Sequence, residues 1–180
     1  MIMSYTEAVE KYGSQYQLAR MVAEGKVYKL EEGIYSEKPY EPELGIIMKK
    51  YPKAVLAGES AYYYHDLTDV IPEHYELATP SKASKISDPR VRQIYVKEEI
   101  FPLGVIKEDH EGCDVRIYDK EHMLIELLRN KNSMPYDLYK EILSNYRRII
   151  TGLQLWRIQE YAAVFPKSRM ISKALDSEVL

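Results

Sequence analysis

The N-terminal end of the chain carries apolar side chains at spacings of three and four, the period of one helix face. Ser4, with Glu7 three positions later, has the pattern of a reciprocal capping box, which begins a helix. Gly13 can end that helix in a left-handed conformation. Ser14 and Gln17 then repeat the capping pattern. Two short helices joined at one glycine are typical of a helix-turn-helix unit.

The second of these helices has two distinct faces. Leu18, Met21 and Val22 share the apolar face, so we expect them to pack inward. Tyr16 and Arg20 then lie on the opposite, exposed face. Such a face is open either to read DNA or to pack against another protein surface.

Alternating apolar residues follow the two helices. Residues 27–30 and 34–36 predict two strands of a hairpin, and Gly33 can supply the positive φ of its turn. Helix, helix and hairpin in this order predict a small winged helix-turn-helix over residues 1–36. Residues 37–42 are charged and contain two prolines, so they read as a linker.

Residues 43–180 form the second predicted part, a mixed α+β domain that ends in a helical segment. Short helices are expected at residues 44–50 and 59–65 around a brief strand at 54–56, strands at 75–79, 91–96, 105–107 and 113–118, and helices beginning near Asp119, Ser133 and Leu155. The fold class is therefore predicted as α+β.

Composition agrees with a globular intracellular protein. A chain of 180 residues with 46% hydrophobic content can build a sizeable core. Its single cysteine, Cys113, excludes an internal disulfide and favours a reducing compartment. The N-terminus has acidic residues and no long apolar run, and no segment approaches the roughly 20 apolar residues that span a bilayer. We therefore expect a cytoplasmic protein with no membrane contact.

Charge weakens the case for DNA binding. The chain has 25 basic and 28 acidic residues, and residues 1–40 hold five basic against six acidic side chains. Phosphate neutralisation supplies most non-specific affinity for DNA, so such a unit would hold DNA weakly by charge alone. On the residues alone, DNA binding and an interaction scaffold that only packs or dimerises remain equally open.

Five side chains are the candidates for DNA contact if the second helix enters a major groove. Gln17 could read adenine, and Arg20 could read guanine or contact a phosphate. Tyr16 could reach a phosphate from the same helix, and Lys26 and Lys29 could reach the backbone from the wing.

Enzymatic signatures are weak. The sequence lacks a phosphate-binding loop, a dinucleotide-binding glycine motif, paired CxxC motifs, HExxH and GxSxG. His65, Asp66, His74 and Glu76 could approach a metal, but their spacing across a proline turn is a weak signal, and His65 fits a helix end better. A metal-dependent nuclease or transferase remnant would use the scattered carboxylates Glu59, Asp66, Asp69, Glu76, Asp109, Asp114 and Asp119. We therefore expect no catalytic residue, metal or cofactor.

Three stretches of the sequence, which hold four matching features in order, resemble the AbiEi-like antitoxins of type IV toxin-antitoxin (abortive phage infection) systems. They are SQYQLARMVAEGKVYKLEEGIYS, which resembles the family's recognition helix and wing, YPKAVLAGESAYYYHDLTDVIPEHYELATPS, with its Ser-Ala helix and Thr-Pro strand end, and the strand pair and following helix in LGVIKEDHEGCDVRIYDKEHMLIELLRNKN.

The resemblance implies a protein without enzymatic activity that represses its own operon and opposes a separate nucleotidyltransferase toxin. By position, the resemblance assigns contacts with operator DNA to five residues, Tyr16, Gln17, Arg20, Lys26 and Lys29. It assigns no residue to the neutralisation of the toxin. Two departures stand out. The helix that family members usually place before Ser4 is missing, and the wing reads Leu-Glu-Glu-Gly where basic residues are common. The alternative is an interaction scaffold or homodimerisation module derived from that family, without DNA binding.

Overall fold

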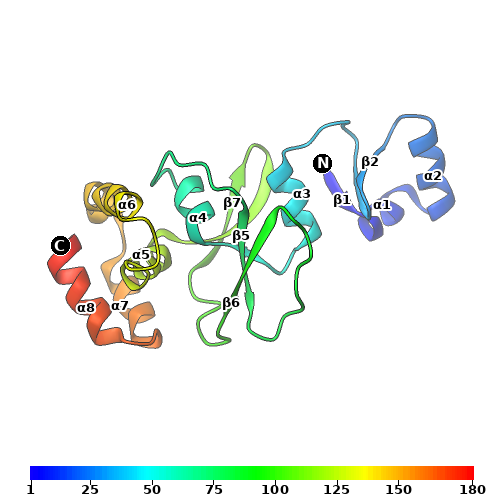
Figure 1. The fold of residues 1–180 in the computed structure, drawn as a ribbon. Coiled ribbons are helices and arrows are strands. Elements are labelled where there is room, and N and C mark those ends of the chain that lie inside the picture. The colour runs from blue at the N-terminus through cyan, green and yellow to red at the C-terminus, as the bar shows by residue number, and fades with distance from the viewer. The chain divides into compact units, whose positions relative to one another are not determined.

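The computed structural model describes residues 1–180 as a mixed α+β fold with helices α1 to α8 and two β-sheets, which confirms the predicted fold class (Figure 1). The chain divides into two compact units. The first unit comprises Met1–Ala54 and Glu108–Val115, and the second comprises Val55–Lys107 and Arg116–Leu180. Residues 37–42, the predicted linker, form an irregular segment between a strand and a helix. The proposal that residues 1–36 are a domain by themselves stays a prediction.

The first unit is built on a three-stranded antiparallel sheet in the order β1-β3-β2. Its elements are β1 Ile2–Ser4, α1 Tyr5–Tyr12, α2 Gln15–Ala23, β2 Tyr28–Glu31, β3 Ile34–Ser36 and α3 Glu43–Lys50. Strand β1 was not predicted, because its three residues are too few to show a period and, unlike β3, it has no turn glycine beside it that marks a hairpin. Its place comes from pairing with β3, in which Ile2 lies opposite Ser36.

Local capping explains why α1 and α2 begin where they do. The Ser4 hydroxyl accepts the Glu7 backbone N–H at 3.3 Å, and the Glu7 carboxylate accepts the Ser4 N–H at 2.7 Å, as the predicted capping box requires. Gly13 ends α1 with φ +88°. Ser14 caps α2 by accepting the Gln17 N–H at 3.1 Å. Satisfied N–H groups at each helix start thus fix the corner between the helices.

The core of the first unit joins both helices to the sheet. Its buried members are Met3, Ala8, Leu18, Val27 and Tyr35, with Met21 and Val22 packed against them. The predicted inward face of α2 is therefore confirmed.

Helix α3 approaches the tip of the hairpin formed by β7 (Val105–His110) and β8 (Cys113–Tyr118), and this tip belongs to the same unit. A Cβ placed on Gly45 of α3 would collide with the Cys113 side chain. Only glycine allows this close approach.

The second unit contains most of a five-stranded mixed sheet in the order β6-β5-β4-β8-β7. The strands are β4 Val55–Leu56, β5 Tyr75–Pro80, β6 Val91–Val96, β7 Val105–His110 and β8 Cys113–Tyr118. Strand β4 runs antiparallel to β5 and parallel to β8, and β5 runs parallel to β6. The short helix α4, Gly58–Tyr64, connects β4 to β5.

Helices occupy the C-terminal part of the chain and group together in Figure 1. They are α5 Lys120–Arg129, α6 Tyr136–Ile149, α7 Leu155–Val164 and α8 Ser168–Ala174. Helix α5 contacts the other three. Helix α8 was not predicted, because Ile171 is its only buried residue and one buried position gives no period. None of the helices is both long and apolar enough to cross a membrane.

Candidate functional site

Helix α2 presents the first candidate surface. Leu18 anchors the helix at 2% exposure, which turns the neighbouring positions outward. Tyr16 is 75% exposed, and Gln17 and Arg20 are also exposed. The three helix residues predicted to contact DNA therefore share one solvent-facing side of α2.

The cations of this surface are held by acidic neighbours. Arg20 donates from Nε to Glu24 Oε1 at 2.7 Å, and Lys26 donates from Nζ to Glu24 Oε2 at 2.7 Å. The fold thus brings Arg20 and Lys26 together on one carboxylate. Lys26 and then Arg20 lower the pKa of Glu24 through these hydrogen bonds.

The last predicted contact, Lys29 on β2, is paired separately. Its Nζ lies 2.6 Å from Glu32 Oε2, and Glu32 stands in the turn before β3. This hydrogen bond raises the pKa of Lys29. All these pairs face water, where ion pairs are weak and solvent competes for them. A phosphate could therefore replace either glutamate without a large structural change.

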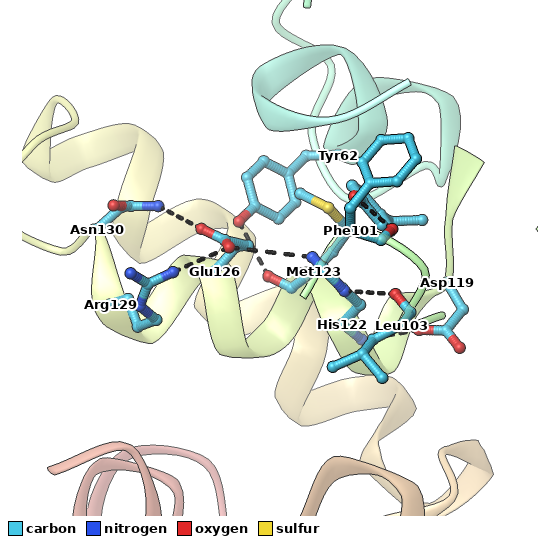
Figure 2. Close-up of polar contacts among 10 residues, drawn as sticks. Tyr62, Phe101, Leu103, Asp119, His122, Met123, Glu126, Arg129 and Asn130 are labelled. Carbon is cyan, nitrogen blue, oxygen red and sulfur yellow. Dashed lines mark hydrogen bonds and ion pairs between the residues drawn. The ribbon is translucent and has the colours of Figure 1, made fainter. Parts of the chain in front are cut away.

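A second cluster lies on α5 in the second unit, and Figure 2 shows it. Asp119 caps α5 by accepting the His122 backbone N–H at 2.8 Å, as predicted for Asp119. The His122 side chain is 1% exposed. Its ring stacks on Tyr118 with centroids 3.7 Å apart, and it meets the Phe165 ring edge to face with centroids 5.2 Å apart. Packing therefore fixes the imidazole in one orientation.

The proton on His122 is placed by its hydrogen bond. Nδ1 lies 2.7 Å from the carbonyl oxygen of Leu103, which can only accept, so Nδ1 carries the hydrogen. Burial, which outweighs the effect of this bond, lowers the pKa of His122 to about 4, and the ring is neutral at pH 7. Nε2 then has a free lone pair. It faces Glu126 Oε1 at 3.9 Å, beyond hydrogen-bond distance.

Glu126 lies one turn further along α5 and is held by its C-terminal neighbours. Arg129 donates to its Oε1 at 3.0 Å, and the Asn130 side chain donates to its Oε2 at 2.9 Å. Burial nevertheless raises the pKa of Glu126. The carboxylate is thus fixed in place while its environment disfavours the negative charge.

His122 and Glu126 line a pocket of about 290 Å³ within the second unit. Glu76 on β5 lies on the same pocket, where its carboxylate accepts the backbone N–H of Glu59 and pairs with Arg92 at 3.3 Å. Burial raises the pKa of Glu76. Two carboxylates of raised pKa and one neutral imidazole thus converge on one cavity, which suits it to accept protons or N–H donors.

Sequence reasoning missed this cluster. The available signal was the spacing of His122 and Glu126, four residues apart on a helix whose remaining face is apolar. Only the fold adds Glu76 from a distant strand.

The residues weighed for metal binding separate into other roles. His65 ends α4, as expected, but is buried and donates from Nε2 to the Tyr118 carbonyl oxygen at 2.7 Å. The carbonyl of His74 accepts the Ser60 hydroxyl at 3.0 Å, and the Asp66 side chain is exposed. No group of three or more His, Cys, Asp or Glu side chains could hold a metal ion.

Comparison with known proteins gives no family. No model of a known protein family matches the chain, and a search of curated proteins finds no match.

Proposed function

We propose that the protein is an AbiEi-like antitoxin and transcriptional autoregulator, in which the first unit binds operator DNA as a winged helix. The observation that carries the proposal is the exposed side of α2, where Tyr16, Gln17 and Arg20 stand free of the core. The sheet order β1-β3-β2 behind α1 and α2 supports it, because a winged helix needs a hairpin beside its second helix.

The roles of the five residues follow from their chemistry. The Gln17 amide can pair bidentately with adenine, and the Arg20 guanidinium with guanine. Tyr16, Lys26 and Lys29 can hold phosphates and so fix the register on the duplex. Because Glu24 and Glu32 already engage the cations, binding requires that DNA phosphates replace these carboxylates. Affinity should then depend steeply on salt.

The test of this proposal is fluorescence anisotropy of the full chain with its own upstream promoter DNA at several salt concentrations. Substituting Arg20→Ala should weaken binding by about 1 to 3 kcal/mol if the side chain reads a base. The matched control is Arg148→Ala, which removes the same charge from an exposed position on α6 in the second unit. Equal effects of the two substitutions, or no binding by the natural chain at low salt, would remove the DNA assignment.

The antitoxin half of the proposal rests on the resemblance alone. The resemblance implies a nucleotidyltransferase toxin encoded beside the gene, and co-expression with such a neighbouring toxin tests this half. The full chain should restore growth, and the Arg20→Ala chain should do so equally well if repression and antitoxin action lie in different units. Failure of the full chain to restore growth would remove the antitoxin role.

One observation favours the alternative, a scaffold that pairs with a second copy through the same surface. Every cation on the proposed DNA face already contacts a glutamate, whereas Tyr16 remains a large exposed aromatic side chain. The scaffold predicts a dimer in light scattering that dissociates on Tyr16→Glu substitution. A monomer at all concentrations would exclude the scaffold. A dimer that persists in the Tyr16→Glu chain would exclude this surface as the dimer interface.

A further inference from the structure

The pocket in the second unit offers hydrogen-bond acceptors that the protein itself leaves partly unused. His122 Nε2 has a lone pair that faces Glu126 Oε1 at 3.9 Å, which is beyond hydrogen-bond distance. Glu126 accepts one bond at each oxygen, and a carboxylate has room for about four. His122 Nε2 and the Glu126 carboxylate are thus neighbouring acceptors, as Figure 2 shows, and a ligand with two neighbouring hydrogen-bond donors would match them.

The charge balance of the lining disfavours phosphorylated ligands. Glu59, Glu76 and Glu126 are the acidic lining residues, and Arg92 is the only lining cation. Arg92 pairs with Glu76 at 3.3 Å, so the lining has two more acidic side chains than basic ones. A ligand for this pocket is neutral or cationic at the end that enters.

The volume of the pocket and its lining residues limit the class of ligand further. A volume of about 290 Å³ lies at the lower limit of small-molecule sites, which begin near roughly 300 Å³. Ala57, Ile94, Val96 and Met134 supply apolar surface between the acceptors. The site thus suits a compact or flat group rather than a whole nucleotide.

We propose that this pocket binds a small ligand through an N–C–N edge with adjacent N–H donors, which Glu126 and His122 Nε2 accept. Guanidinium compounds and guanine-type bases both carry this edge. The site is independent of DNA binding by the first unit, since every residue that lines it belongs to the second unit.

Two probe pairs distinguish the sources in isothermal titration calorimetry with the full chain. Guanosine is compared with inosine, which lacks the exocyclic amine, and agmatine with butane-1,4-diamine, which lacks the N–C–N group. We expect binding of guanosine or of agmatine, and at least tenfold weaker binding of its matched partner. Guanosine would identify a purine site and agmatine a guanidinium site.

Two variants test whether the bound probe occupies this pocket. Glu126→Gln keeps the shape but replaces one acceptor oxygen by a donor, so it should weaken binding at least tenfold. Val96→Phe adds volume to the lining without changing charge and should also abolish binding, which keeps the test valid if Glu126→Gln fails to fold. The control is Glu160→Gln, the same change at an exposed position of α7, which should bind as the natural chain does.

Three outcomes would overturn the assignment. They are the absence of binding by both guanosine and agmatine, equal binding by the matched partners, and unchanged affinity in folded Glu126→Gln and Val96→Phe chains. The Arg20→Ala chain should bind the probe as the natural chain does. The experiments therefore distinguish failure of the DNA-binding proposal from failure of the ligand-binding proposal.

Discussion

The two candidate regions hold their charged side chains in opposite ways. On α2 and the β2–β3 hairpin, Arg20, Lys26 and Lys29 meet glutamates in open water. In the pocket, His122 is buried and Glu126 is partly buried, and burial shifts both pKa values toward the neutral forms. Surface pairs can be exchanged for a ligand with little structural change, whereas buried groups are fixed before any ligand arrives. The first region is suited to adjustable contact and the second to a defined partner.

The largest expected difference between the regions is in packing. Leu124 of α5 is 0% exposed, and Leu124→Ala should lower the free energy of unfolding by about 2 to 5 kcal/mol through lost burial and a cavity. Tyr16→Ala removes a larger side chain but should change it by only about 0.5 kcal/mol, because Tyr16 is 75% exposed. Urea denaturation measures the free energy of unfolding of both variants. A similar loss in the two variants would mean that α2 packs rather than presents a free face.

The next effect is pH dependence from His122. Its pKa of about 4 lies below the ordinary value of 6.5, so the unfolded chain binds the proton first as the pH falls. Stability from this group is complete above about pH 6.5 and is lost toward pH 4, by roughly 3 kcal/mol over the window. Denaturation at several pH values should show this slope in the natural chain and a flatter one in His122→Gln.

The raised pKa values of Asp119 and Glu126 act in the opposite direction, since these groups bind protons more readily when folded. The difference between the natural and His122→Gln chains therefore isolates the histidine. His74→Gln is the matched control, because His74 is exposed. Identical slopes in the natural and His122→Gln chains would contradict the buried neutral imidazole.

The smallest effect on stability is expected from Glu24→Gln. Glu24 is an exposed residue, so loss of its charge should leave the unfolding midpoint unchanged within error. The same substitution frees Arg20 and Lys26 and should strengthen binding to promoter DNA, with a steeper dependence on salt. Anisotropy of the two chains at matched salt makes the comparison. Unchanged or weaker DNA binding would show that these cations do not face the duplex.

Local pattern was sufficient for much of the fold. The capping residues Ser4 and Asp119, the glycine corner at Gly13 and the inward face around Leu18 follow from contacts between near neighbours in the chain. Such contacts join residues close in sequence, so the spacing of apolar residues and the residue types at helix ends predict them directly. Elements without a period, strand β1 and helix α8, were missed.

The sequence by itself therefore determined the α+β class, most element positions and the exposed side of α2. Tertiary structure decided which charged groups lose water and which groups distant in sequence meet. Glu126 and His122 are near neighbours on α5, but Leu103 fixes the imidazole proton from one distant segment and Glu76 reaches the same pocket from another. Burial and the proximity of distant segments arise only when the chain closes on itself, so no local pattern records them.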